Sequence, residues 1–204
     1  GKVGSSDAPA VAWRDYKQIV HEKVVQHSTS KHVYNKRDSY FAGALARANL
    51  NFPLLGDLAK SVAGKLGFKA PCHNPFMNNV AQVIETADCY VKALEKIDRL
   101  LDMDLTLAPP DVRPKAGRGV GVAEVPRGIL FHEYEFDDKG VCTMANLVIP
   151  TGQNLANIDA DLRALVPQIL DEPKESIQLK CEMLVRAYDP CISCSVHLLD
   201  IDWV

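Results

Sequence analysis

The stretch DPCISCSVH, residues 189–197, places two cysteines at a spacing that suits metal binding. Cys191 and Cys194 are separated by two residues, and His197 follows them. Thiolates are soft ligands for zinc, copper(I), nickel and iron, and a two-residue spacer lets both sulfurs reach the same ion. From the motif alone, two interpretations remain open: a structural zinc site that also uses His197 and one further ligand, and a simple surface dithiol.

Two other uses of a CxxC pair fit this sequence less well. A thioredoxin-type redox pair opens a helix within a βαβ unit, whereas this pair follows a segment with helical periodicity. Covalent haem attachment requires a histidine directly after the second cysteine, but Ser195 and Val196 intervene here. Metal ligation is therefore favoured over both.

The residues that precede the pair suggest a charge partner elsewhere in the chain. Pro190 lacks an N–H and has a fixed φ, so it stiffens the approach to Cys191. Asp189 is an anion beside a thiolate, and such a pair is costly unless a cation or a proton compensates it. Arg127 is the candidate cation, although an arginine between Pro126 and a glycine could also be an exposed turn residue.

A predicted β-hairpin brings the other candidate residues to one place. The alternating stretches GILFHEYEF and VCTMANLVI flank DDKG, in which Asp and Gly are strong turn residues. Pro126 and Arg127 precede the first strand, and Pro150 and Thr151 follow the second. In an antiparallel hairpin the first strand begins at the end of the sheet where the second strand finishes, so these two dipeptides should lie close together.

The rest of the chain is predicted to be mostly helical. Apolar spacing predicts helices over Trp13–His27, twice within residues 39–67, over Asn78–Leu101 and over Glu172–Ala187. The helix over Asn78–Leu101 should bury one apolar stripe and leave the opposite face in solvent. The stripe is formed by Val80, Val83, Ile84, Ala87, Val91, Leu94, Ile97 and Leu101, and the solvated face by Gln82, Glu85, Asp88, Lys92, Glu95 and Arg99. Residues 107–121, rich in proline and glycine, predict a long irregular connection. The fold class is therefore mainly α with a small antiparallel hairpin sheet (α+β).

Composition narrows the class of protein. The chain has 204 residues, of which 47% are hydrophobic, and a net charge of -3. It has no basic excess for nucleic acid and no apolar run long enough to cross a bilayer. Six cysteines, of which only one pair is close in sequence, indicate a reducing compartment and predict a cytoplasmic location. We expect a flexible lead-in over residues 1–12, one domain over 13–197 and a tail over 198–204.

Several motifs together resemble a known family. The stretches SYFAGALARANLN, NPFMNNVAQVIE, AGRGVGVAEVPRGILFHEYE, ANLVIPTGQN and DPCISCSVH occur in that order. They resemble the C-terminal half of the large, catalytic subunit of nickel-iron hydrogenases, in the cytoplasmic group that includes F420-reducing, methyl-viologen-reducing and bidirectional NAD(P)-linked enzymes. The resemblance covers Trp13 to His197. It implies reversible oxidation of H2 to protons and electrons.

The resemblance also implies roles for individual residues. In that family four thiolates hold nickel, and two of them bridge to an iron that carries carbon monoxide and cyanide. Cys191 matches a terminal nickel ligand that can accept a proton, and Cys194 matches a bridging ligand. Arg127 matches the arginine above the open metal position, and Asp189 matches the carboxylate that orients it.

Further positions match the surroundings of the metals. Pro126 and Thr151 match the positions around the cyanides, and Glu124 and His132 match structural supports. His197 and the backbone oxygen of Leu147 match ligands of a second cation, Mg2+ or Fe2+, near the C-terminus.

Two departures from the family pattern matter. The other cysteine pair, within an Arg-x-Cys-Gly-x-Cys stretch, is absent, so another chain or segment must supply two thiolates. In addition, LLDIDWV follows His197, where the family's precursor is usually cut.

The resemblance also implies partners. An iron-sulfur small subunit should take the electrons, with an electron-acceptor subunit as a further expected partner. The rival interpretation is a non-catalytic relative that holds zinc, or an assembly or scaffold subunit. A scaffold like the quinone-side subunit of respiratory complex I is disfavoured, because that subunit dispenses with these cysteines.

Overall fold

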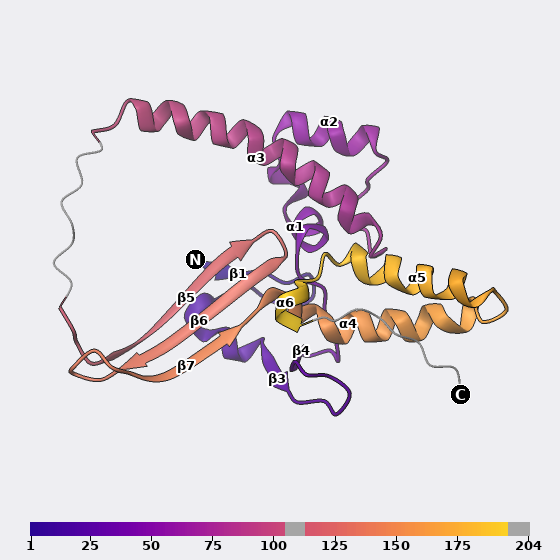
Figure 1. Ribbon diagram of the computed structural model, residues 1–204. Coiled ribbons are helices and arrows are strands. Elements are labelled where there is room, and N and C mark those ends of the chain that lie inside the picture. Colours follow the sequence, from indigo (N-terminus) through magenta and orange to yellow (C-terminus); the bar gives the residue numbers. More distant parts are fainter. Residues whose placement is uncertain (105–112, 196–204) are drawn as a thin grey trace.

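A computed structural model describes residues 1–104 and 113–195 (Figure 1). One part of it is a helical layer made of α1 (Ala44–Asn51), α2 (Asp57–Lys65) and the first half of α3 (Met77–Leu101), with a short 3-10 turn η2 (Phe52–Leu54) between the first two. Small side chains fill most of the contact between these helices, namely Ala44, Ala48, Ala59, Ala63 and Ala81, together with Leu45, Phe68 and Ile84. Alanine lets helix backbones approach closely, so three short helical segments form a dense core. The two predicted helices within residues 39–67 and the long predicted helix are confirmed.

The predicted hairpin is confirmed as part of a larger sheet. Strands β6 (Gly128–Phe136) and β7 (Cys142–Val148) pair antiparallel, and β5 (Gly117–Val125) pairs with the other edge of β6. The sequence predicted an irregular connection up to Gly121, which is wrong for residues 117–121. Glycines at alternate positions of β5 hide its strand character, since glycine has little preference for a strand. Pairing with β6 along the full length of β5 imposes the extended conformation.

The predicted helix over Trp13–His27 is wrong. Only Trp13–Gln18 is helical, as a 3-10 segment (η1) that is interrupted at Asp15. The chain then enters β3 (His21–Lys23), which pairs with β4 (His32–Tyr34). Tyr16 and Val20 had predicted a helix face, but they are buried in a cluster with residues distant in sequence. Long-range packing therefore overrides the local pattern.

Regular structure also starts earlier than the sequence indicated. Strands β1 (Lys2–Val3) and β2 (Val11–Ala12) pair before η1 begins, and Val3 is buried.

The C-terminal part forms a pair of helices. Helix α4 (Pro150–Leu165) is followed by η3 (Val166–Gln168), α5 (Lys174–Ala187) and the short α6 (Ile192–Ser195). Figure 1 shows α4 and α5 side by side, with α6 against the start of α4. The sequence predicted α5 but missed α4. The first turns of α4 bury polar side chains, Gln153 and Asn154 among them, so the helix lacks the apolar stripe that would have marked it.

Helix α3 is packed along its first half only. Its buried positions, Asn78, Ala81, Ile84 and Asp88, all lie before residue 89, and every residue from Cys89 to Leu101 is exposed. The predicted apolar stripe thus continues into solvent. The prediction of a solvated face is wrong at Asp88, which is 8% exposed, and whose carboxylate accepts the N–H of Gly56 and pairs with Lys92. Gln82 and Glu85, which belong to the same predicted face, are also partly buried.

A buried carboxylate joins η1 to the sheet. Glu133 of β6 accepts hydrogen bonds from Tyr16 Oη at 2.7 Å and Arg118 Nε at 2.5 Å, and Lys17 Nζ lies 2.7 Å away. Burial alone would raise the pKa of Glu133, but these donors outweigh it and lower the pKa to about 2. Burial and the Glu133 contact raise the pKa of Tyr16 to about 12. The carboxylate therefore stays charged and links three segments.

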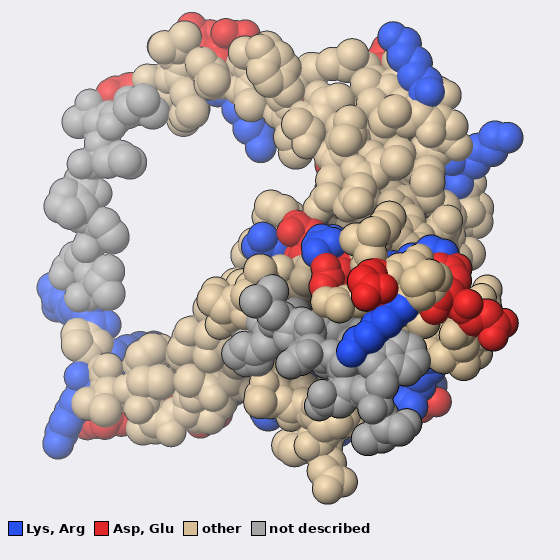
Figure 2. Space-filling view, turned by 45° about the vertical axis from the view of Figure 1, so that its right-hand side comes forward, with Lys and Arg blue, Asp and Glu red and all other residues tan. Residues whose placement is uncertain are grey.

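Among the described residues, no helix is long and apolar enough to cross a membrane. On the face shown in Figure 2, acidic and basic side chains are interspersed, without a broad region of one sign.

Candidate metal-adjacent site

The turn between β5 and β6 positions Arg127. Val125 and Gly128 face each other in the register, so Pro126 and Arg127 form a two-residue turn. Gly128 has φ of 140°, and a Cβ at this position would lie 3.1 Å from the Cβ of Ala42 and 3.3 Å from that of Pro150. Only glycine fits this close approach. The turn is therefore held against the start of α4, as the sequence predicted.

The end of α5 delivers Asp189 to the same place. Asp189 adopts a left-handed conformation with φ of 51°, which residues other than glycine adopt uncommonly. Its Oδ1 lies 3.2 Å from Arg127 Nε, and its Oδ2 accepts a hydrogen bond from Gln82 Nε2 at 3.0 Å. Both carboxylate oxygens are thus engaged, and the predicted ion pair is present.

The first turn of α4 contacts the cysteine motif. Thr151 is buried, and its Oγ1 accepts the N–H of Cys191 at 3.1 Å. The sulfur of Cys191 lies 3.6 Å from Ser193 Oγ and is disulfide-bonded. Ligation of a metal by Cys191 therefore requires the reduced form, because the thiolate is the ligand.

The structure thus brings Arg127, Thr151, Asp189 and Cys191 together from three separate parts of the chain. Pro126 lies in the same turn, and its carbonyl oxygen accepts a hydrogen bond from Arg47. Arg127 and Asp189 have side-chain exposures of 46% and 35%, so the site opens on the surface of this chain.

The remaining predicted ligands are less well placed by the structure. Cys194 belongs to α6, and Leu147 lies in β7 opposite His132, with an exposed side chain. His197 falls outside the described residues, so the second cation site stays a prediction. Within residues 1–104 and 113–195 no three His, Cys, Asp or Glu side chains converge as a metal-binding group. Glu124 and His132, which were predicted to be structural supports, contact Arg47 and Tyr134, respectively.

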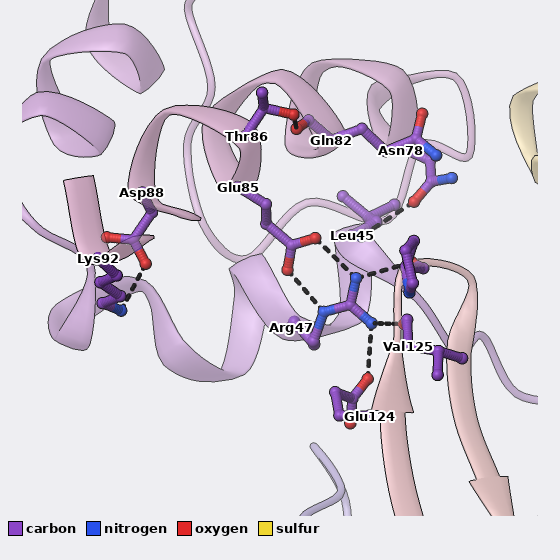
Figure 3. A network of polar contacts seen from close by, with 11 residues as sticks. Leu45, Arg47, Asn78, Gln82, Glu85, Thr86, Asp88, Lys92, Glu124 and Val125 are labelled. Carbon is purple, nitrogen blue, oxygen red and sulfur yellow. Dashed lines mark hydrogen bonds and ion pairs between the residues drawn. The ribbon is translucent and has the colours of Figure 1, made fainter. Parts of the chain in front are cut away.

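Sequence reasoning missed a set of supporting residues on α1 and α3 (Figure 3). The guanidinium of Arg47 forms a two-pronged contact with Glu85, at 2.6 and 2.7 Å, and also contacts Glu124 at 2.6 Å. It donates to the carbonyl oxygens of Val125 at 2.9 Å and Pro126 at 2.7 Å. Burial opposes the charge of Arg47, but the contacts to the two glutamates outweigh it and raise the pKa of the guanidinium.

Asn78 connects two helix ends at the same site. Its Oδ1 accepts the N–H of Leu45 at 3.0 Å, and its Nδ2 donates to the carbonyl of Ala187 at 2.8 Å. Asn78, Gln82 and Glu85 stand at positions i, i+4 and i+7 of α3 and so share one face. That spacing was visible in the sequence, but polar side chains on an amphipathic helix are ordinarily solvated.

Comparison with known proteins identifies the family of the chain. Residues 69–197 match the family model described as nickel-dependent hydrogenase. The chain is 34% identical over 199 residues to sulfhydrogenase 1 subunit alpha of Pyrococcus furiosus, covering 97% of this chain and 46% of the relative. It is 34% identical over 202 residues to NAD-reducing hydrogenase HoxS subunit beta of Cupriavidus necator, covering 92% of this chain and 41% of the relative.

A solved structure shows the same fold. The NAD+-reducing [NiFe]-hydrogenase in the H2-reduced state superposes with a TM-score of 0.76 at 28% identity, over 94% of this chain and 44% of that chain. The chain therefore spans less than half of the length of these relatives, and the part that it matches includes α3, the β5–β7 sheet and the cysteine motif. On the family match and the shared fold, this chain belongs to the nickel-dependent hydrogenase family.

Proposed function

We propose that the chain is the C-terminal part of a hydrogenase large subunit and that it takes part in the reversible oxidation of H2 to protons and electrons. The observation that carries the proposal is the contact of Arg127 with Asp189 beside the contact of Thr151 with Cys191. These residues come from a sheet turn, a helix start and the segment after α5. A nickel-iron centre with carbon monoxide and cyanide ligands would supply the Lewis-acid and redox chemistry at this place.

The residues fit such a centre in kind but not in number. Cys191 offers a soft thiolate, Arg127 offers a cation that offsets anionic ligands, and Thr151 keeps an O–H to donate while its oxygen accepts the Cys191 N–H. This chain has two cysteines at suitable spacing, Cys191 and Cys194, whereas the proposed centre uses four thiolates. A further segment with an Arg-x-Cys-Gly-x-Cys-like pair is therefore part of the proposal.

Each residue then has a defined task. Cys191 and Cys194 would hold the metals, and the thiolate of Cys191 would be the group that accepts a proton. Arg127 would place its positive charge beside the metals, and Asp189 fixes the orientation of the guanidinium through Nε. Pro126 and Thr151 would lie beside the cyanide ligands.

At the C-terminus, His197 and the carbonyl oxygen of Leu147 would hold Mg2+ or Fe2+. A reducing compartment such as the cytoplasm would keep Cys191 available as a thiolate.

Exposure of the site supports an obligate complex. The Arg127 side chain is 46% exposed in this chain. Because the interaction between two charges is stronger where water is excluded, a covering chain would strengthen the Arg127–Asp189 pair. The second half of α3 also leaves large apolar side chains uncovered, namely Val91, Leu94, Ile97 and Leu101. We propose that the segment that supplies the two thiolates covers both surfaces, and that an iron-sulfur small subunit accepts the electrons.

Metal analysis of the intact assembly tests the proposal. The protein is purified with its native partners under reducing conditions, and nickel, iron and zinc are measured together with the infrared spectrum and H2-dependent dye reduction. Nickel and iron with carbonyl and cyanide bands are expected. Zinc at the cysteines, without such bands and without dye reduction, would refute catalysis and favour a structural zinc site.

A further inference from the structure

Three polar residues on one face of α3 contact the segments that carry the Arg127–Asp189 pair, either directly or through Arg47. We call Asn78, Gln82 and Glu85 the α3 polar face. Gln82 contacts Asp189 directly, Glu85 holds Arg47 against the turn that precedes Arg127, and Asn78 holds the carbonyl of Ala187. All three side chains point toward these neighbours, not into solvent, and Figure 3 shows the Glu85–Arg47 branch.

We infer that Gln82 and the Arg47–Glu85 pair are positioning residues that set the geometry of the Arg127–Asp189 ion pair. The inference rests on the proposed function, because it assigns these residues to the orientation of Arg127 over the metal position. It does not require them to touch substrate or cofactor.

The hydrogen bond from Gln82 is suited to fixing the orientation of the Asp189 carboxylate. Asp189 pairs with Arg127 through Oδ1, and Gln82 donates to the other oxygen, Oδ2. A neutral donor fixes the plane of the carboxylate without competing for its charge, whereas a lysine at the same position would offer a second cation. A hydrogen bond to a charged acceptor is also stronger than one between neutral groups. Gln82 therefore holds Asp189 while leaving its charge to Arg127.

The Arg47 branch fixes the other partner. Its guanidinium donates to the carbonyls of Val125 and Pro126, the two residues immediately before Arg127, while Glu85 holds it from α3. Its side chain is 17% exposed, so water competes little for these contacts. Only a planar fork with several donors can serve a carboxylate and two carbonyls together, so lysine cannot replace Arg47.

Two variants and one control separate positioning from general stabilisation. Gln82→Leu removes the donor to Asp189, and Arg47→Lys keeps the charge but loses the fork. The control is Gln178→Leu on α5, where Gln178 donates to Glu182 of the same helix, away from the site. Each is purified as the full assembly, and kcat, KM for H2, the melting temperature and hydrogen–deuterium exchange are measured.

We expect the two variants to have opposite effects on hydrogen exchange, which we call the exchange crossover, and to lower kcat without changing KM. Gln82→Leu should speed exchange of the Cys191 amide and leave the β5–β6 turn unchanged, whereas Arg47→Lys should do the reverse. In both variants kcat should fall by about tenfold, the factor that corresponds to loss of one hydrogen bond to a charged group, with KM nearly unchanged.

Two results would overturn the inference. In the first, both variants have the same kcat and the same hydrogen exchange as Gln178→Leu. In the second, hydrogen exchange rises uniformly and the melting temperature falls while kcat is unchanged. If the wild type holds no nickel but the exchange crossover remains, the proposed function fails while the positioning of the ion pair stands.

Discussion

Replacing Glu133 by glutamine should destabilise the sheet at neutral pH and should do so much less in acid. The ordinary pKa of the glutamate is 4.5, and in the fold it is lowered to about 2. At about 1.36 kcal/mol per pH unit, this difference corresponds to at most about 3.4 kcal/mol. The side chains of Lys17 and Arg118 are 55% and 47% exposed, so solvent screens them and we expect about 2 kcal/mol.

The direction of the pH dependence follows from the lowered pKa. A carboxylate that binds protons less readily in the folded state stabilises the fold above pH 4.5, and this stabilisation disappears as the pH falls through about 2. Glutamine keeps one acceptor oxygen for Tyr16 and Lys17, which both contact Oε2, but its amide hydrogens then face the donor on Arg118, which contacts Oε1. The glutamine also lacks the negative charge that pairs with Lys17 and Arg118. The variant should therefore differ most from the wild type near pH 7, and by less than half as much near pH 3.

Hydrogen exchange of the β5–β7 amides in the assembled protein measures this effect. About 2 kcal/mol corresponds to roughly 30-fold faster exchange at pH 7, and the ratio to wild type at each pH cancels the intrinsic rates. Glu135→Gln is the matched control, because Glu135 lies two residues further along β6 and is partly exposed. Equal exchange in the two variants at pH 7 would refute the argument that Glu133 is a stabilising buried charge.

Three further predictions concern the site and its completion. Cys191→Ser replaces a soft thiolate by a harder and less acidic ligand, so nickel retention and H2-dependent dye reduction should both be lost; wild-type turnover would contradict the ligand assignment. Arg127→Lys should keep the metals but lower the activity at least ~10-fold, or about 1.4 kcal/mol in the barrier, and unchanged activity would make Arg127 an ordinary turn residue. Residues 1–204 expressed alone should be poorly soluble or molten and hold no nickel, whereas a well-folded monomer with one tightly bound zinc would favour a structural site.

The parts of the fold that local patterns control could be predicted from the sequence. The Asp-Gly turn and alternation predicted β6 and β7, and long apolar periodicity predicted α3. By contrast, the apolar spacing after Trp13 predicted a helix that does not form. Instead, β3 pairs with β4, and Tyr16 packs on Phe131 with ring centroids 4.8 Å apart. Such contacts between distant segments have no local signature.

The site shows the same division. The pairing of Arg127 with Asp189 could be predicted, because a charge beside a thiolate needs a counter-charge and a hairpin limits where it lies. The roles of Gln82 and Arg47 could not be predicted, since their partners are three carboxylates and two backbone carbonyls from segments distant in sequence. Helix α4 was missed for a related reason, because Gln153 and Asn154 bury amides that satisfy backbone groups of Ile129 and Ala42.

The uncovered half of α3 has a thermodynamic consequence for the proposed assembly. The helix has 25 residues, so it is about 37 Å long, and each of its residues after Asp88 is exposed. A helical segment of this length is only marginally stable in water on its own. Its helix–coil equilibrium and its association with another chain are therefore coupled. Part of the gross interaction energy orders the segment, and the net affinity falls by that amount.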